Sequence, residues 1–346
     1  MSPLLALVDE IRSRPEKAGY DFLWIGTREG VEKPMVEKEG IPYKAIFAGK
    51  LRRYFSWKNL LDIIFIKFGF WQALFIMLSW RPDLVITAGG FVSVPVVWAA
   101  WILRVPALIH QQDVRPGLAN KLMAPFAKVI TVTFEKSLAD YGKKAVWTGN
   151  PVRKNISSPA RSNAFKLKQG LPTILIVGGG TGAKFINDLV AGSINKLTKF
   201  CQIIHTTGNG KMEKNLPGDI AAEKNYHSFE FLGAEKIAEA MQKADLVITR
   251  AGLSTLTELS FLGKPLIIIP IPDSHQEDNA RIYAEHDAAL VLNQKDLTAE
   301  KLIKEIENIL SNPQKMTGLK NNISLLSKPR AREDLVKVIE KLINKC

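Results

Sequence analysis

The stretch that decides the fold runs Thr249-Arg250-Ala251-Gly252-Leu253-Ser254-Thr255-Leu256-Thr257-Glu258. Small residues here open a helix after a strand, and such a helix start offers unbonded backbone N–H groups and a positive dipole end, which suit a phosphate or diphosphate. Glu258 lies one turn beyond Ser254 and Thr255, where it could hold sugar hydroxyls beside bound phosphates. The pattern favours a nucleotide-sugar site, although an ordinary Ser/Thr cap with a surface Glu explains the loop alone equally well.

Strand-like apolar runs alternate with helical stretches on both sides of this loop. The alternation predicts an α/β protein of two doubly wound domains, each a parallel sheet covered by helices, with a cleft between them and ligands at the carboxyl ends of the strands. The predicted strands are Tyr20–Ile25, Leu84–Thr87, Ala107–His110, Val129–Val132, Ala145–Thr148, Thr173–Val177, Gln202–Thr206, Ser228–Leu232, Leu246–Thr249, Leu266–Pro270 and Ala289–Leu292.

A polar, serine-containing stretch predicts a linker over residues 154–170. Residues 1–153 then form an N-terminal domain, and residues 171–329 form a C-terminal domain. We expect the final helix, residues 330–346, to fold back onto the N-terminal domain.

Composition narrows the class of protein. The chain has 346 residues, of which 46% are hydrophobic and 23% charged, as in an ordinary globular protein. Its formal net charge of +13 indicates an anionic partner: nucleic acid, anionic lipid or a phosphorylated substrate. No nucleic-acid-binding motif accompanies this charge, so we expect no nucleic acid. Cys201 and Cys346 are the only cysteines, which excludes a disulfide scaffold and fits a reducing compartment.

The amino-terminal end has an unusual order of elements. Ser2-Pro3 and the apolar residues after it predict a helix, and the strand Tyr20–Ile25 follows, whereas a parallel α/β domain normally begins with a strand and a loop that feeds its first helix. We therefore expect either an unusual start of the fold or a chain that is short by about one strand and one glycine loop. Asp9 and Glu10 interrupt the first apolar run, which argues against a secretory signal.

Residues 60–80 are long and apolar, but Asp62, Lys67 and Gln72 interrupt them, and charges near a bilayer centre are costly, so we do not expect a membrane span. Basic residues interleave with aromatic ones over Lys50–Trp71. This pattern suits contact with an anionic membrane surface, and a core helix with a solvated basic edge is the alternative.

Two glycine turns follow predicted strands. Gly178–Ala183 fits the G-x-G-x-x-A dinucleotide pattern, but the next strand, Gln202–Thr206, carries no acid for ribose hydroxyls, which argues against NAD or FAD. The loop still lets backbone amides approach a phosphate. Ala88–Pro95 is a second glycine turn, in the first domain.

His110 follows another strand of the first domain, where it could act as a base, a ligand or a structural residue. Arg153, at the predicted domain junction, could reach a phosphate or lie on the surface. No D-x-D pair, His/Cys cluster or nucleophile elbow is present, so we expect no metal and no cofactor. The remaining chemistry is positioning of a leaving diphosphate opposite a hydroxyl nucleophile.

The order and spacing of these motifs resemble the MurG family of glycosyltransferase family 28 over nearly the whole chain. The stretches that carry the resemblance are Gly89–Pro95, His110–Lys121, Gly149–Arg153, Gly178–Asn187, Arg250–Glu258 and His275–Ala280. The resemblance implies a GT-B fold of two Rossmann-like domains. It implies an inverting, metal-independent enzyme that transfers GlcNAc from UDP-GlcNAc to undecaprenyl-diphosphate-linked lipid I, making lipid II for peptidoglycan, as a peripheral protein on the cytoplasmic face of the bacterial membrane.

The resemblance also implies roles for individual residues. Glu258 would bind the ribose hydroxyls, Gln276 with His275 would contact the GlcNAc, Leu232 would present its backbone to the uracil, and Arg153 would reach the donor. The full set of candidate substrate-binding residues is Asp113, Arg153, Gly180, Thr181, Leu232, Arg250, Leu253, Ser254, Thr255, Leu256, Thr257, Glu258, His275, Gln276 and Asn279, with His110 as the candidate catalytic residue.

The sequence departs from the family pattern at three places. The family's first strand and glycine loop, with its His, should lie just ahead of Ser2-Pro3. The family's His-Glu-Gln-Asn reads His110-Gln111-Gln112-Asp113, and Gly180 replaces a serine, with Thr181 as a substitute hydroxyl. A non-catalytic nucleotide-sugar-binding or membrane scaffold protein, or a GT-B transferase with another lipid acceptor, is therefore the alternative.

Overall fold

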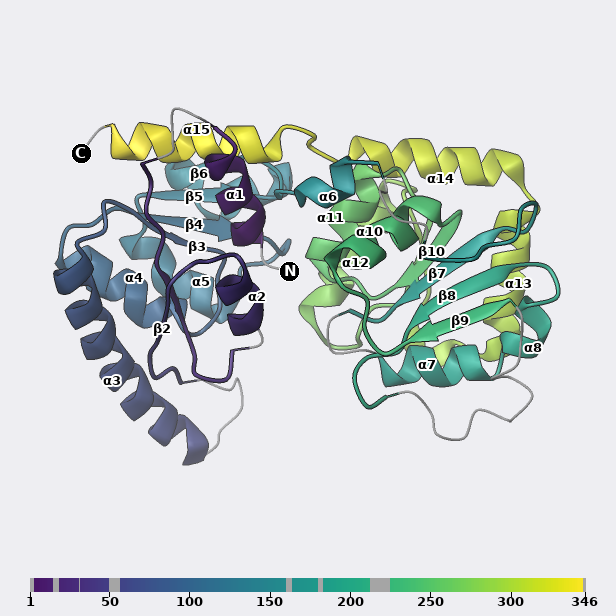
Figure 1. Cartoon of the computed structure of the whole chain (residues 1–346), viewed down its shortest axis with the longest axis horizontal. Coiled ribbons are helices and arrows are strands. Elements are labelled where there is room, and N and C mark those ends of the chain that lie inside the picture. Colours follow the sequence, from purple (N-terminus) through teal and green to yellow (C-terminus); the bar gives the residue numbers. More distant parts are fainter. Residues whose placement is uncertain are drawn as a thin grey trace. The chain divides into compact units, whose positions relative to one another are not determined.

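The computed structural model describes residues 3–14, 19–30, 32–49, 57–159, 164–179, 183–211 and 225–344. The chain divides into two compact units: unit 1 comprises residues 1–151 and 329–346, and unit 2 comprises residues 152–328. Each unit has parallel strands with helices around them (Figure 1), as the alternating pattern predicts. The predicted linker, residues 154–170, belongs to unit 2, and the final helix belongs to unit 1.

The sheet of unit 2 has six parallel strands in the order β9-β8-β7-β10-β11-β12. Four of these strands are buried along their whole length, because their apolar side chains meet helices on both faces. The strands are β7 (Thr173–Val177), β8 (Gln202–Thr206), β9 (Tyr226–Phe229), β10 (Leu246–Thr249), β11 (Leu266–Ile268) and β12 (Leu290–Val291).

The helices of unit 2 cover this sheet with apolar faces. In α13, Thr298 caps the first turn by accepting a hydrogen bond from the Lys301 N–H (3.3 Å), and Leu302, Ile306 and Ile309 are buried at helical spacing. The helices are α6 (Lys154–Ser157), α7 (Lys184–Ala191), α8 (Ile194–Leu197), α10 (Ala234–Lys243), α11 (Leu253–Phe261), α12 (His275–Glu285), η5 (Gln294–Asp296), α13 (Ala299–Leu310) and α14 (Pro313–Leu325).

Unit 1 contains two separate parallel sheets, β1-β2 and β3-β4-β5-β6. The strands are β1 (Trp24–Gly26), β2 (Tyr43–Ala45), β3 (Val85–Thr87), β4 (Ala107–Gln111), β5 (Val129–Val132) and β6 (Ala145–Trp147). The helices are α1 (Pro3–Arg12), α2 (Lys33–Lys38), α3 (Trp57–Trp80), α4 (Ser93–Ile102), α5 (Leu118–Met123), η2 (Ala124–Phe126), η3 (Glu135–Asp140), η4 (Gly142–Lys144) and α15 (Ala331–Ile343). The sequence did not predict β2, and the predicted strand Tyr20–Ile25 is confined to β1.

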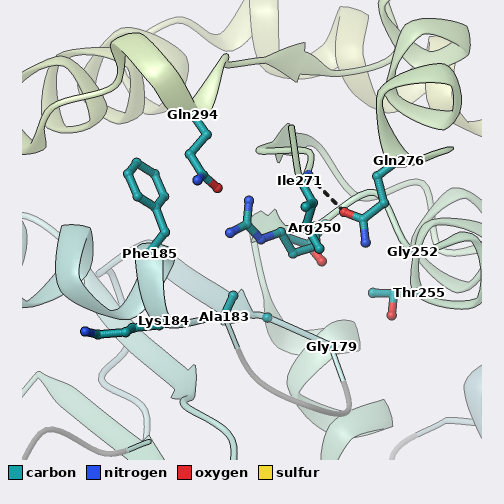
Figure 2. A pocket seen from close by; sticks show the side chains of 12 residues that line it. Gly179, Ala183, Lys184, Phe185, Arg250, Gly252, Thr255, Ile271, Gln276 and Gln294 are labelled. Atoms are coloured by element: carbon teal, nitrogen blue, oxygen red, sulfur yellow. Dashed lines mark hydrogen bonds between the residues drawn. The ribbon is translucent and has the colours of Figure 1, made fainter. Parts of the chain in front are cut away.

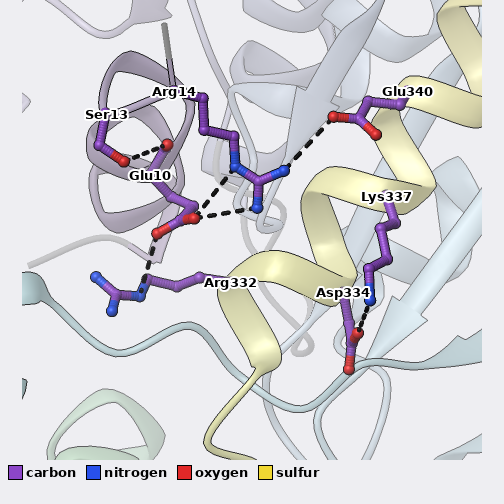
Figure 3. A network of polar contacts seen from close by, with 7 residues as sticks. All are labelled: Glu10, Ser13, Arg14, Arg332, Asp334, Lys337 and Glu340. Atoms are coloured by element: carbon purple, nitrogen blue, oxygen red, sulfur yellow. Dashed lines mark hydrogen bonds and ion pairs between the residues drawn. The ribbon is translucent and has the colours of Figure 1, made fainter. Parts of the chain in front are cut away.

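α15 packs against α1 within unit 1. Leu7 and Ile11 of α1 share an apolar cluster with Leu335 and Ile339 of α15. Polar contacts at the edge of this cluster join α1 and the residues just after it to α15 (Figure 3): Glu10 lies 3.8 Å from Arg332, and Arg14 lies 3.6 Å from Glu340. The first and last helices of the chain thus form one covering layer of unit 1.

Among the helices of the described residues α3 is the longest, with 24 residues, and it packs on α4. A row of large apolar side chains on α3 stays exposed: Phe65, Phe68, Trp71, Phe75 and Leu78. Within the described residues, no helix has the length and apolar character needed to cross a membrane.

Candidate functional site

The strand order of unit 2 creates a switch point between β7 and β10. The chain leaves β7 toward β8 on one side and leaves β10 toward β11 on the other, so the loops after these two neighbouring strands diverge. A pocket of about 440 Å³ lies there. Its lining residues are Gly178, Gly179, Ala183, Lys184, Phe185, Thr249, Arg250, Gly252, Thr255, Ile271, Gln276 and Gln294.

The amino-terminal end of α11 borders this pocket. Gly252 is the N-cap residue, with extended backbone dihedrals, and Thr255 of the first turn lines the cavity. Gly179, on the facing loop, has a φ of 87°, a left-handed conformation that favours glycine. Backbone N–H groups of a first helical turn lack partners inside the helix and attract anions.

Arg250 is a buried cation on the wall of the pocket (Figure 2), and its guanidinium carbon lies 6.0 Å from the centroid of the Phe185 ring. Its Nη1 donates hydrogen bonds to the carbonyls of Ile269 (2.9 Å) and Pro270 (3.1 Å). Its Nε has no hydrogen-bond partner among the described residues, and burial lowers its pKa. A buried guanidinium with an unused N–H is suited to donate a hydrogen bond to an anion.

Arg153 and Glu258 form a two-pronged ion pair within unit 2. Nε of Arg153 lies 2.5 Å from Oε1 of Glu258, and Nη2 lies 2.7 Å from Oε2. Both side chains are about 90% buried, at 11% and 10% exposure. The pair fixes the carboxylate one turn into α11 and leaves it further lone pairs for hydroxyl donors.

Three predicted residues lie on α12. Gln276 lines the pocket, and its Oε1 accepts a hydrogen bond from the Ile271 N–H at 3.2 Å (Figure 2). His275 is exposed at the helix start. Asn279 is fully buried and donates to the carbonyl of Ala251 (3.1 Å), so it holds the loop that leads into α11.

The other residues predicted to bind the sugar donor lie partly beside the pocket and partly in the core of unit 2. Leu253, Leu256 and Thr257 are buried within α11, while Ser254 is half-buried in its first turn. Leu232 is buried after β9. Gly180 and Thr181 lie outside the described residues. The structure thus brings Arg250, Gly252, Thr255 and Gln276 together around one cavity.

His110 lies in β4 of unit 1 and is fully buried. Its Nε2 is 2.9 Å from Oδ1 of Asn150, and its Nδ1 is 3.0 Å from the Thr131 hydroxyl, which assigns the proton of the neutral ring to Nε2. Burial lowers its pKa from 6.5 to about 4. With both nitrogens bonded and no exposure, this geometry favours a structural role over the catalytic role expected from the sequence. Asp113, also expected to bind substrate, is half-buried just after the same strand.

Four residues of the pocket were not predicted: Lys184, Phe185, Ile271 and Gln294. Lys184 begins α7 directly after the glycine loop, and a basic residue at the start of a helix could have identified it as a candidate for binding an anion. Gln294 follows β12, and its Oε1 has no partner among the described residues. No sequence motif marks it. Within the described part of the chain, no group of three or more His, Cys, Asp or Glu side chains could hold a metal.

Comparisons with known proteins agree with this geometry. Residues 1–132 match the Glycosyltransferase family 28 N-terminal domain, and residues 173–337 match the Glycosyltransferase family 28 C-terminal domain. A curated protein of Clostridium botulinum strain Hall is 36% identical over 95% of each chain, and one of Shouchella clausii is 35% identical over 99% of this chain and 95% of its own. Both are named UDP-N-acetylglucosamine–N-acetylmuramyl-(pentapeptide) pyrophosphoryl-undecaprenol N-acetylglucosamine transferase.

Among solved structures, MurG of Acinetobacter baumannii matches with a TM-score of 0.74 and 27% identity, over 98% of this chain and 95% of that one. A UDP-GlcNAc 2-epimerase of Neisseria meningitidis matches with a TM-score of 0.71 at 13% identity, over 98% of each chain, a likeness of fold alone. The predicted GT-B fold is confirmed.

The buried histidines predict an acid-labile structure. Because the folded pKa of His110 is about 4 and the ordinary value is 6.5, the unfolded chain takes up a proton first as pH falls, and stability present above pH 6.5 is lost toward pH 4. The full loss from this group is ~3 kcal/mol. His205 of unit 2, also with a pKa lowered to about 4 by burial, adds a similar loss.

Urea unfolding of unit 1, followed at pH 7.5 and pH 5, measures this effect. We expect His110→Gln to be less stable than the parent at pH 7.5 but to lose less stability on acidification. Lys301→Gln, on an exposed site of α13, serves as the control and should keep the parent's pH dependence. An unchanged slope in His110→Gln would mean that the ring is already protonated in the folded protein.

Proposed function

Because the chain belongs to glycosyltransferase family 28, we propose that it transfers GlcNAc from UDP-GlcNAc to undecaprenyl-diphosphate-MurNAc-pentapeptide (lipid I) and forms lipid II for peptidoglycan. The chain is a UDP-sugar-dependent glycosyltransferase by its family. The named donor and acceptor are those of the relatives, which match this chain over almost its whole length.

The pocket at the switch point of unit 2 is the observation that carries the donor assignment. Its wall combines the start of α11, the unused Nε of Arg250 and the basic Lys184. These groups would bind the diphosphate of UDP-GlcNAc and stabilise the charge that develops on it as it leaves. Since protein cations and backbone amides can supply this charge, we propose that transfer is independent of a metal ion.

Glu258 would hold the ribose hydroxyls of the donor, because its carboxylate is fixed by Arg153 and retains free lone pairs. In this assignment Arg153 acts on the donor through Glu258, since both prongs of its guanidinium are engaged. Gln276 faces the same cavity and would contact the GlcNAc, as the family resemblance implies.

We propose an inverting, single displacement. The acceptor hydroxyl attacks the anomeric carbon from the face opposite the diphosphate, a new C–O bond forms, and the bond to UDP breaks with both electrons leaving on the diphosphate. The hydroxyl proton passes to a base. His110 is a poor candidate for this base, because its buried ring has both nitrogens bonded.

The membrane contact predicted from Lys50–Trp71 concerns unit 1. Its residues 50–56 lie outside the described part, but the exposed row on α3 continues the aromatic pattern and Lys67 is exposed beside it. Trp101 and Ile102, at the end of α4, are exposed as well. Apolar side chains flanked by cations suit insertion into an anionic bilayer surface, so we propose peripheral binding at the cytoplasmic face of the cell membrane.

The activity is tested by incubating the protein with UDP-GlcNAc and a short-chain lipid I analogue in the presence of EDTA and analysing the products by mass spectrometry. We expect a product that has gained one GlcNAc with inverted anomeric configuration. UDP-GlcNAc binding without any product would instead support the non-catalytic alternative. Turnover only with a different lipid acceptor would support another specificity.

The role of Glu258 is tested by binding measurements with UDP and 2′,3′-dideoxy-UDP. Glu258→Gln keeps an acceptor for Arg153 but loses the charge, so we expect it to bind UDP ~10-fold to 100-fold more weakly, the value of a charge-assisted hydrogen bond. The dideoxy analogue should bind the parent and the variant equally. Glu307→Gln, an exposed site on α13, is the matched control. An equal loss of affinity for both ligands would show that Glu258 does not bind the ribose hydroxyls.

Membrane contact is tested by sedimentation with vesicles of phosphatidylglycerol and phosphatidylcholine. We expect the triple variant Phe68→Ser, Trp71→Ser, Phe75→Ser to bind at least ~10-fold more weakly, because each exposed aromatic contributes apolar area on insertion. Leu325→Ser removes a still more exposed apolar side chain from unit 2 and should change nothing. Equal binding of the triple variant would exclude α3 as the contact.

A further inference from the structure

α6, over residues 154–157, is a helix of only four residues that packs against α10 (Figure 1). So short a helix is not stable by itself, and the carbonyl groups of its last turn have no partners inside it. The side-chain amide of Gln242 on α10 provides a partner. Its Nε2 donates to the carbonyl of Ile156 (3.1 Å) and to that of Ser158, the residue after the helix (2.7 Å). Gln242 thus caps the carboxyl end of α6.

Two further contacts hold the same segment on α10. Nδ2 of Asn155 donates to the carbonyl of Ala234, the first residue of α10 (2.6 Å). Farther along the chain, the Ala164 N–H donates to both carboxylate oxygens of Glu239, at 3.1 and 3.2 Å. Glu239 is buried within α10, so this contact is shielded from water. The described residues between 155 and 164 are therefore attached to α10 at several points.

Arg153 immediately precedes α6, so the position of its backbone depends on that helix. It is the N-cap residue, with extended dihedrals (φ −61°, ψ 144°), and its carbonyl accepts a hydrogen bond from the Ile156 N–H (3.1 Å). Its side chain reaches Glu258 of α11, where it forms the nearly buried two-pronged ion pair. The pair thus connects a segment attached to α10 with a carboxylate on α11.

Lys264, shortly after α11, joins the same two helices a second time. Its Nζ donates to the carbonyls of Gln242 (2.6 Å) and Ala244 (2.8 Å) at the end of α10. The path from α10 through α6, Arg153 and Glu258 to α11 therefore closes on itself. An arginine side chain loses much rotamer entropy when it is fixed, so a fixed backbone on one side and a fixed carboxylate on the other favour the pair.

We propose that Gln242 is a positioning residue for the sugar donor: it fixes α6 on α10, and through Arg153 it sets the place of the Glu258 carboxylate. This role rests on the assignment of Glu258 to the ribose hydroxyls of the donor. Gln242 is not among the residues that line the pocket, so it acts without touching substrate. A small displacement of a binding group by a distant change is sufficient to weaken the contact that the group makes.

The test compares the affinities of UDP and 2′,3′-dideoxy-UDP for the parent, Gln242→Leu, Glu258→Gln and the double variant. Gln242→Leu keeps the approximate volume of the side chain but cannot donate to either carbonyl. We expect it to weaken UDP binding ~3-fold to 10-fold, about the value of one hydrogen bond, and to leave the dideoxy analogue unchanged. In the Glu258→Gln background it should cause no further loss, because both changes act on the same contact.

Three other variants separate positioning from general destabilisation. Asn155→Leu removes a different attachment of α6 and should cause the same ribose-dependent loss, which keeps the test decisive if Gln242→Leu does not fold. Ile306→Val removes a methyl group from the core of unit 2, so it should lower the unfolding temperature and leave both affinities unchanged. Lys236→Leu, at an exposed site of α10, is the matched control and should bind both ligands as the parent does.

UDP affinity that stays at the parent's value in Gln242→Leu and Asn155→Leu, while Glu258→Gln is weakened, would overturn the proposal and leave the donor site as assigned. Equal losses for UDP and the dideoxy analogue would overturn it too, since they would indicate a general disturbance of the pocket. If Glu258→Gln binds UDP as the parent does, Glu258 does not bind the ribose, and the role of Gln242 is wrong with it. Product formation from UDP-GlcNAc then decides the proposed function separately.

Discussion

Parallel strands buried on both faces impose the constraint on which the rest of this structure depends. Each such strand must be followed by a helix that returns the chain to the same end of the sheet, so all carboxyl ends meet at one edge. In unit 2 this brings the loop after β7, with Gly179, to the loop after β10, with Arg250 and Gly252. The pocket is thus a consequence of strand order, and the chemistry depends on which side chains the two loops carry.

The charged side chains of unit 2 have two kinds of surroundings: some form an internal ion pair, and one is available to an anionic ligand. Arg153 and Glu258 satisfy one another inside a nearly buried pair, and so contribute a fixed carboxylate rather than a free cation. Arg250 donates hydrogen bonds to the carbonyls of Ile269 and Pro270 and lies over the Phe185 ring, and no carboxylate of the described residues pairs with it. A buried charge without a counterion is costly, and an anionic ligand would offset that cost. The fold therefore retains an unbalanced cation where a diphosphate is proposed to bind.

Periodicity and loop chemistry predicted the α/β class, most strands and the helix start at Gly252, because these depend on nearby residues. β2 was missed because Tyr43–Ala45 is a short edge strand with a polar centre, and its pairing with β1 is not local. Gln294 was missed for the same reason, since only the parallel pairing of β11 and β12 brings it to the cavity. His110 was recognised as a candidate, but its burial between Thr131 and Asn150 depends on contacts 21 and 40 residues away. Sequence patterns identify the residue types of a site, whereas long-range packing decides which of them are exposed.

The two units differ in how their parallel strands are paired among the described residues. In unit 2 the central strand β7 has partners on both edges and is fully buried, which is the stable condition for a parallel sheet. In unit 1 no pairing joins β1 to β3 among the described residues, and both strands instead pack against apolar clusters that they share with the covering helices. The loops that line the pocket of unit 2 follow β7 and β10, and each of these strands is paired on both edges, so the best-paired strands of that sheet hold the pocket residues in place.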